Sequence, residues 1–410
     1  MVSELTGTGE TVLTGWLEDR SAVVRRRCAD RSARPRTLEL RQVRPRPQRP
    51  ESGGRNHHHP VRTAHLGQGD RVVMSKEQQL QLDAILRQGG LDTNADVPTL
   101  RAAFDELVAQ VPVAPDVQQK PVEIGGVAGV EVTIQGNEAE NVILYFHSGV
   151  YVIGNAAATV PLVGDLVRRT GTRAVTLEYR LAPEDPYPAA VEDARAAYEG
   201  LLAQGIAPGQ IALAGESAGG GLAVALLLAL REAGVPLPSC GYLMSPYVDL
   251  TLSGETLATK QEVDPVLTPD GLEARVPDYV GGADAADPYI SPIFGDLRGL
   301  SPLLIQVGSH EILLSDALRL AGRAAISDVP VTLEVTPGVP HVFQAYAGLL
   351  DEAGAALDRA SDFLNAQLAH SPSTPKQRDP ARLVPAIHLK GDNGEMHLPR
   401  APRPRAGGRS

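Results

Sequence analysis

The chain has 410 residues, a net charge of −11 and only two cysteines, Cys28 and Cys240. Its length allows one large domain or two ordinary ones with a buried core. Two cysteines exclude a disulfide framework and favour a reducing compartment. The N-terminus lacks the basic and apolar pattern of a signal peptide, and no apolar run approaches the roughly 20 residues needed to span a bilayer. We therefore expect a soluble cytoplasmic protein with no membrane partner, present as a monomer or a homodimer.

The charge is unevenly distributed along the chain. Residues 1–73 contain 14 arginines, no lysine and 8 acidic residues, whereas residues 371–410 contain 8 basic residues, 3 acidic residues and seven prolines. Both segments are predicted to be disordered. A further hypothesis is that translation starts at Met74, so that residues 1–73 lie upstream of the true start. Residues 74–370 carry a net charge of −22, which speaks against nucleic acid as a partner of this region.

Two short helices are predicted before the first strand. A capping box at Ser75 and Gln78 predicts the start of one helix, and a second helix is predicted from about Pro98. We expect residues 74–118 to form a helical cap and residues 119–370 to form the catalytic domain.

Strands and helices alternate through the rest of the chain. The pattern predicts strands near 121–125, 128–135, 141–146, 172–179, 210–214, 239–244, 302–307 and 330–336, and helices near 158–170, 188–204, 218–233, 315–326 and 345–369. This alternation predicts an α/β fold with a mostly parallel central sheet flanked by helices. The long segment 246–300 is rich in Pro, Asp and Gly, has weak helical signals and is predicted to form a second lid or a binding segment.

The sequence Gly215-Glu216-Ser217-Ala218-Gly219 joins a strand of small residues to a helix-forming stretch. This is the pattern of a nucleophile elbow, in which a tight turn forces the serine into a strained backbone conformation. A Cβ atom at Gly215 or Gly219 would collide with the neighbouring strand or helix. The helix that starts near Ala218 directs its free N–H groups toward the place where an oxyanion would form. The pattern therefore favours acyl transfer with Ser217 as the nucleophile.

Other reactive side chains follow three more predicted strands. The stretch His147-Ser148-Gly149-Val150-Tyr151 follows the third strand, Gly308-Ser309-His310-Glu311 follows the seventh, and residues 337–344, which include His341, follow the eighth. Such groups gather at the carboxyl ends of the strands in doubly wound sheets. The chain order of serine, acid and histidine is the order expected for an α/β-hydrolase.

On these motifs the chain resembles the hormone-sensitive-lipase family of bacterial esterases. The resemblance covers roughly residues 74–370, and the stretches that carry it are 147–150, 178–184 with 188–190, 215–219, 308–314 and 340–344. It implies an α/β-hydrolase fold with an N-terminal helical cap and hydrolysis of short acyl esters without a cofactor.

The resemblance also implies the catalytic residues. Ser217 matches the nucleophile, His341 the base and Glu311 the acid, at a position where the family more commonly has aspartate. A glutamate can accept a hydrogen bond from imidazole Nδ1 and stabilise the imidazolium. The alternative acid is Asp316, which is otherwise predicted to begin or cap the following helix.

The oxyanion hole maps by the same resemblance to the backbone N–H groups of Gly149, Val150 and Ala218. The sequence departs from the family at Ser148 and Val150, where glycines are usual. The backbone donors are retained if φ at Val150 is negative, and the Val150 side chain should narrow the site and favour small acyl groups. The side chains expected to line the substrate site are Ser148, Tyr151, Glu216 and His310. Loop-positioning roles are expected for His147 and Glu184.

Together these residues predict a serine hydrolase that cleaves short-chain carboxylic esters through an acyl-enzyme on Ser217. The predicted partner is a small-molecule acyl ester, and no metal or other cofactor is expected because the sequence has no clustered His and Cys ligands and no phosphate-binding loop. Two alternatives stay open. The same triad could serve an amidase, deacetylase or lactonase, or the fold could be kept by a small-molecule binding protein without turnover.

Overall fold

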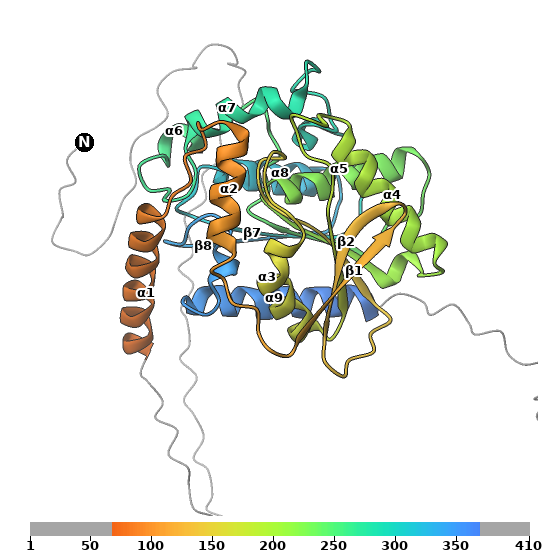
Figure 1. Ribbon diagram of the computed structural model, residues 1–410, viewed down its shortest axis with the longest axis horizontal. Helices are drawn as coiled ribbons and strands as arrows, with labels where there is room; N and C mark the ends of the chain where they lie inside the picture. The colour runs from red at the N-terminus through yellow and green to blue at the C-terminus, as the bar shows by residue number, and fades with distance from the viewer. Residues whose placement is uncertain (1–67, 370–410) are drawn as a thin grey trace, which may run out of the picture. The chain divides into compact units, whose positions relative to one another are not determined.

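The computed structural model describes residues 68–369. An eight-stranded sheet runs through this part of the chain, in the order β1-β2-β4-β3-β5-β6-β7-β8 (Figure 1). The strands are β1 (Val117–Ile124), β2 (Val127–Ile134), β3 (Val142–Phe146), β4 (Arg173–Leu177), β5 (Ile211–Glu216), β6 (Cys240–Met244), β7 (Leu303–Gly308) and β8 (Val331–Thr336). The β1–β2 and β2–β4 pairs are antiparallel and the other five pairs are parallel. The predicted mostly parallel sheet is confirmed, with each of the eight predicted strands present.

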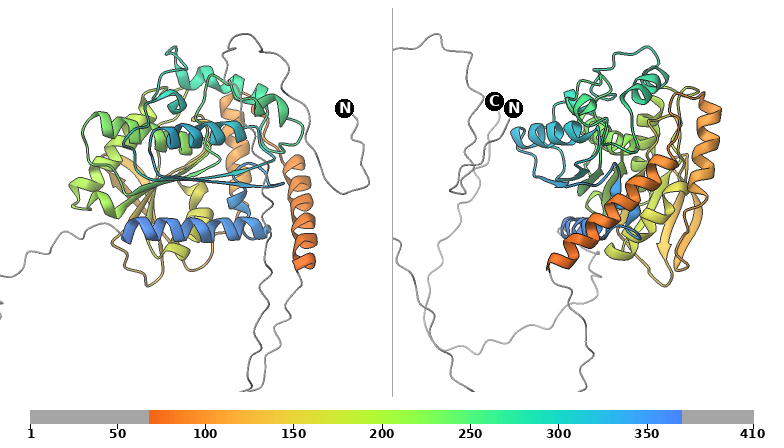
Figure 2. Two further views of the ribbon diagram at one scale, coloured as in Figure 1. Left: turned by 180° about the vertical axis from the view of Figure 1, so that it is seen from behind. Right: turned by 90° about the vertical axis from the view of Figure 1, so that its left-hand side faces the viewer.

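Helices cover both faces of the sheet because its central strands are apolar throughout. Every residue of β3 is buried, and Leu144 belongs to one hydrophobic cluster while its neighbours Ile143 and Tyr145 belong to another. Figures 1 and 2 show α8 and α9 on opposite sides of the sheet. The first cluster includes the apolar sides of α4 (Ala189–Ala203), α5 (Ala218–Glu232) and α8 (Leu314–Ile326), and the second includes those of α3 (Val160–Thr170) and α9 (Asp351–Ala369).

Two helices precede the sheet, α1 (Gln68–Gln88) and α2 (Val97–Val108). The helix start predicted at Ser75 is wrong, because Ser75 lies inside α1 and its hydroxyl donates to Glu352 of α9 instead of capping the helix. Leu82 of α1 is buried against Val339 and Phe343, which flank His341 in the sequence. Helix α1 therefore packs on the loop that carries the predicted catalytic base.

The segment between β6 and β7 contains α6 (Thr256–Thr259) and α7 (Pro269–Val280), which the sequence indicated only weakly. The Thr268 side chain caps α7 by accepting a hydrogen bond from the N–H of Gly271. Leu272 of α7 and Leu100 of α2 belong to the same hydrophobic cluster. Helix α2 and the segment 246–300 therefore share one hydrophobic cluster, and their role as a lid stays a prediction.

The predictions for residues 1–67 and 370–410 lie outside the described residues. Residues 68–73, which the sequence assigned to the N-terminal extension, are helical in α1. Among residues 68–369, no helix is long and apolar enough to cross a membrane.

Candidate active site

Ser217 occupies a strained turn between β5 and α5. Its backbone angles are φ 53° and ψ −119°, a conformation that costs a non-glycine residue on the order of 1–3 kcal/mol. A Cβ on Gly215 would lie 2.2 Å from the carbonyl oxygen of Gly219, and a Cβ on Gly219 would lie 2.1 Å from that of Phe146. The predicted elbow geometry and both glycine requirements are thus confirmed.

Glu311 and His341 meet at the carboxyl edge of the sheet, beyond β7 and β8. His341 Nδ1 lies 2.7 Å from Glu311 Oε2, and both side chains are buried. The other carboxylate oxygen, Oε1, accepts hydrogen bonds from the Gly308 N–H at 2.6 Å and the Ser245 hydroxyl at 2.8 Å. Burial lowers the pKa of His341, but the hydrogen bond and charge of Glu311, with the charges of Asp264 and Glu216, outweigh it and raise the pKa overall. The pair is therefore suited to hold a protonated imidazole.

Glu216, which precedes Ser217 in the elbow, interacts electrostatically with His341. Glu216 is buried and lies close enough to His341 for each charge to shift the pKa of the other group. Burial raises the pKa of Glu216 to about 7, and the charge of His341 partly opposes that rise. Within residues 68–369 the Ser217 hydroxyl has no hydrogen bond to His341, and in unliganded enzymes such contacts commonly tighten only when substrate binds.

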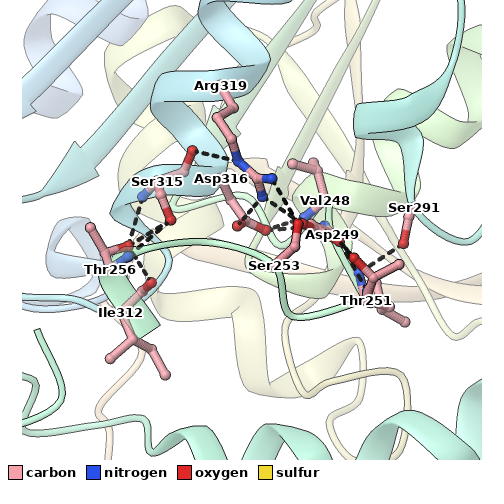
Figure 3. A network of polar contacts seen from close by, with 11 residues as sticks. Val248, Asp249, Thr251, Ser253, Thr256, Ser291, Ile312, Ser315, Asp316 and Arg319 are labelled. Atoms are coloured by element: carbon pink, nitrogen blue, oxygen red, sulfur yellow. Dashed lines mark hydrogen bonds and ion pairs between the residues drawn. The ribbon is translucent and has the colours of Figure 1, made fainter. Parts of the chain in front are cut away.

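Asp316, the alternative acid, is engaged elsewhere (Figure 3). Its Oδ2 accepts hydrogen bonds from the backbone N–H groups of Val248 at 3.0 Å and Asp249 at 3.1 Å, and its Oδ1 lies 3.3 Å from Arg319 Nη2. Burial raises the pKa of Asp316 to about 7. Asp316 lies in the first turn of α8, and its carboxylate holds the chain that leaves β6.

The glycine-rich stretch differs from the expectation at Val150. Its φ is 49°, so the condition of a negative φ is not met, and Tyr151 follows with φ 64°. The physical reason is a tight turn, in which the Gly149 carbonyl accepts hydrogen bonds from the N–H groups of both Val152 and Ile153 at 2.9 Å. No acceptor among the described residues is bonded to the N–H of Gly149 or Val150, so both groups remain available as donors despite the positive φ.

The remaining predicted site residues lie on the surrounding loops. Tyr151 is buried and its ring stacks on Tyr279 of α7, with centroids 3.8 Å apart. His147 stacks on Tyr179 at 4.1 Å, and burial lowers the pKa of His147 to about 4. Ser148 and His310 are half-buried, and burial is the main cause of a lowered pKa at His310. The lining roles of these side chains stay predictions.

Three residues that were not predicted from the sequence make hydrogen bonds to the loops of the site. Ser245 and Asp264 contact the acid loop: Ser245 reaches Glu311 itself, and Asp264 Oδ2 accepts the N–H of the next residue, Ile312, at 2.8 Å. Arg101 of α2 donates to the carbonyl oxygens of Val152 and Ala182 and pairs with Glu184. Ser245 follows the end of β6, so the rule about carboxyl ends of strands could have found it. Asp264 and Arg101 could not be predicted, because their partners lie 48 to 83 positions away in the sequence and no local pattern marks them.

Across the described residues, no His, Cys, Asp and Glu side chains are grouped in a way that could hold a metal ion.

The chain is similar to known hydrolases over the region that contains these residues. A family profile described as an alpha/beta hydrolase fold matches residues 143–345. An esterase of Acinetobacter venetianus is 38% identical over 265 residues, which cover 64% of this chain and 87% of the relative. An acetyl-hydrolase of Streptomyces hygroscopicus is 44% identical over 222 residues, which cover 54% of this chain and 74% of the relative.

A solved structure is similar over the same region. The crystal structure of an esterase from the bacterial hormone-sensitive lipase family is 38% identical, superimposes with a TM-score of 0.68, and is matched over 71% of this chain and 98% of its own. The chain therefore belongs to the hormone-sensitive-lipase family of α/β-hydrolases.

Proposed function

We propose that this protein is a carboxylic ester hydrolase that cleaves short-chain esters through an acyl-enzyme on Ser217, with His341 as general base and Glu311 as the acid. Family membership and the esterase relatives support hydrolysis of esters. The observation that carries the residue assignment is the buried 2.7 Å contact between His341 and Glu311, located beside the strained elbow that presents Ser217.

The proposed reaction has two halves. His341 takes the proton of Ser217 as its hydroxyl oxygen attacks the ester carbonyl carbon, and the N–H groups of Gly149, Val150 and Ala218 stabilise the oxyanion. The intermediate collapses, and the alcohol leaves with the proton from His341. Water then attacks the acyl-enzyme while His341 takes its proton. The bond between Ser217 Oγ and the acyl carbon breaks, His341 returns the proton to Ser217 Oγ, and the carboxylic acid product is released. Glu311 accepts the hydrogen bond from His341 Nδ1 and stabilises the imidazolium.

Small acyl groups are the proposed substrates. Val150 is a buried valine in the turn that supplies two of the proposed oxyanion donors, and Tyr151 of the same turn stacks on Tyr279, so both side chains should narrow the acyl site. The 44% identical relative from Streptomyces hygroscopicus is named an acetyl-hydrolase, which favours acetyl among the small acyl groups. That similarity also supports a second candidate function, removal of an acetyl group from an amide nitrogen by the same residues.

The N-terminal helices and the segment 246–300 are proposed to cap the site. Arg101 of α2 is bonded to the carbonyl oxygen of Val152, next to the proposed oxyanion donors, and Tyr279 of α7 contacts Tyr151. Each segment thus contacts the glycine-rich turn, and their side chains should decide which alcohol or amine portion fits.

The test is a substrate panel measured with the wild type and Ser217→Ala side by side. p-Nitrophenyl esters from acetyl to palmitoyl, a lactone and an N-acetylated amine are compared, and a fluorophosphonate probe reports a reactive serine. We expect the highest kcat/KM on acetyl to butyryl esters and loss of both turnover and labelling in Ser217→Ala. Turnover retained in Ser217→Ala would refute the nucleophile, and an optimum at long acyl chains would refute the substrate class.

A further inference from the structure

We infer that the tetrapeptide Met244-Ser245-Pro246-Tyr247, named here the hub turn, assembles the three catalytic groups, and that the Ser245 hydroxyl is a positioning residue for both Glu311 and the His341 loop. This inference rests on the proposed function. It assigns a role to a segment that contains neither the nucleophile, the base nor the acid.

The backbone of the hub turn holds Ser217 from both sides. The Ser217 N–H donates to the carbonyl oxygen of Met244 at 2.9 Å, and the Ser217 carbonyl accepts from the N–H of Tyr247 at 2.9 Å. The turn also lies directly against the start of α5, since a Cβ on Gly221 would come within 2.1 Å of the Tyr247 carbonyl oxygen. The strained conformation of Ser217 is therefore fixed by two hydrogen bonds to one short segment.

The side chain of Ser245 holds the other two groups. Its hydroxyl donates to Glu311 Oε1 at 2.8 Å and accepts the N–H of Val342, the residue after His341, at 3.0 Å. A hydroxyl has one hydrogen to donate and lone pairs to accept, so both bonds can exist at once. One oxygen atom thus joins the acid to the loop of the base.

The direction of the Ser245 side chain is set by its backbone. Ser245 is fully buried, has φ 46° and donates its own N–H to the carbonyl oxygen of Gln306 in β7 at 2.8 Å. This bond extends the contact between β6 and β7 past the end of β6. The left-handed conformation, uncommon for a residue other than glycine, is one in which the hydroxyl reaches Glu311 and Val342 together.

Loss of the hydroxyl would affect the base and the acid at once. Glu311 Oε1 would keep only the Gly308 N–H as donor, so the carboxylate could turn away from His341. The N–H of Val342 would be left without a partner in a buried site, which loosens the loop that carries His341. Both changes misalign the imidazole and neither alters a group expected to touch substrate, so the effect should fall on kcat more than on KM.

The far side of the hub turn is anchored as well. Asp316 binds the N–H groups of Val248 and Asp249, the two residues after Tyr247, and Arg319 bridges Asp316 and Asp249 (Figure 3). Asp316 lies on α8, which begins three residues after Glu311. The hub turn is therefore tied to the acid loop through Ser245 and through α8.

The experiment compares Ser245→Ala and Ser245→Gly with Ser301→Ala and Ser217→Ala. Ser301 is a matched control, because it is also a buried serine whose hydroxyl makes a hydrogen bond, here to the carbonyl oxygen of Pro238 at 2.6 Å, away from the site. Active sites are titrated with a fluorophosphonate, so that kcat is expressed per reactive Ser217 and unfolded protein does not count. Thermal unfolding is measured for each variant.

We expect both Ser245 variants to lose roughly 10- to 100-fold in kcat per titrated site, with KM changed less than about threefold, and Ser301→Ala to keep the wild-type kcat. A kcat within about twofold of wild type in Ser245→Ala would overturn the inference. So would recovery of wild-type kcat in Ser245→Gly alone, because glycine relieves the positive φ without restoring the hydroxyl. If Ser245→Ala does not fold, the glycine variant decides by the same criterion. Turnover in Ser217→Ala would instead overturn the proposed function.

Discussion

Replacing Glu311 with glutamine tests the assignment of the acid most directly. The change keeps the size of the side chain and one carbonyl oxygen but removes the negative charge 2.7 Å from His341 Nδ1. Two unit charges at that distance interact by about 6 kcal/mol at an effective dielectric constant of about 20, which corresponds to about four powers of ten in rate. The charge of a carboxylate and an imidazolium is spread over several atoms, so we expect kcat of Glu311→Gln to fall about 10³- to 10⁴-fold.

Asp316→Asn is the matched comparison, because it makes the same change from acid to amide at the alternative acid. The pKa of Asp316 is raised to about 7, so its neutral form is already well populated at neutral pH and an amide resembles it. Asparagine also keeps one oxygen to accept the N–H groups of Val248 and Asp249. We expect less than about a tenfold loss in kcat per titrated site, with a lower melting temperature.

The assay is hydrolysis of p-nitrophenyl acetate with active sites titrated by fluorophosphonate. A kcat of Glu311→Gln within tenfold of wild type would refute the assignment of Glu311. An equal loss in Asp316→Asn would refute the argument that Asp316 has a structural role only.

Three further predictions follow from contacts at the site. Gly219→Ala should lower the melting temperature by about 10 °C or more, or prevent folding, because its Cβ would lie 2.1 Å from a backbone oxygen. The control is Gly322→Ala in α8, whose Cβ meets no atom within 4 Å and which should be neutral or stabilising. Equal changes in melting temperature, measured by calorimetry, would contradict this prediction. Arg101→Gln should lower kcat about 3- to 10-fold, because the carbonyl oxygen of Val152 loses its hydrogen bond to Arg101. Glu184→Gln removes only an exposed ion pair, so its kcat should stay near that of the wild type in the same assay. Similar losses of kcat in both variants would contradict a role for the bond between Arg101 and Val152. Burial raises the pKa of Glu216 from 4.5 and of Asp316 from 3.8, each to about 7. The folded state therefore retains protons that the unfolded chain releases, and these protons contribute to the free energy of unfolding. That contribution is fully present below about pH 4 and is lost as the pH rises through 7. The melting temperature should fall between about pH 4 and pH 7. In Glu216→Gln it should fall less steeply, and an unchanged slope would show that Glu216 does not titrate in that range.

The sheet and most of its helices could be predicted from the sequence because their signals are local. Strand β3 is a continuous apolar run, and the elbow carries Gly215 and Gly219 on either side of Ser217, where backbone atoms approach closely. The start of α1 was misplaced because Ser75 has the residue type of a cap but bonds to Glu352, 277 positions away. Helices α6 and α7 were indicated only weakly, since α6 has only 4 residues and two prolines and a glycine interrupt the apolar periodicity of α7.

The sequence predicted the candidate reactive groups of the site more readily than the contacts that support them. The elbow pattern indicated Ser217, and the family resemblance indicated Glu311 and His341, which the structure brings into contact. The conformation of Val150 could not be read from its residue type, because valine rarely has a positive φ. Ser245 was missed although it follows a predicted strand, since a lone serine carries no chemical signature. Its importance comes from two partners 66 and 97 positions away.

The continuity of the hub turn with the segment 246–300 affects how substrate range can be changed by recombination. The residues that should select the alcohol portion leave β6 through the same peptide that orients Ser217 and Glu311. A chimaera with a relative's segment grafted from residue 245 should therefore disturb the proposed catalytic residues. Crossover points should instead lie after Asp249 and before Ser291, whose hydroxyl accepts the N–H of Leu250. The segment Met244–Asp249 and its bonds to Asp316 would then keep their native sequence. Such a chimaera could change the substrate specificity without changing the position of the proposed catalytic residues.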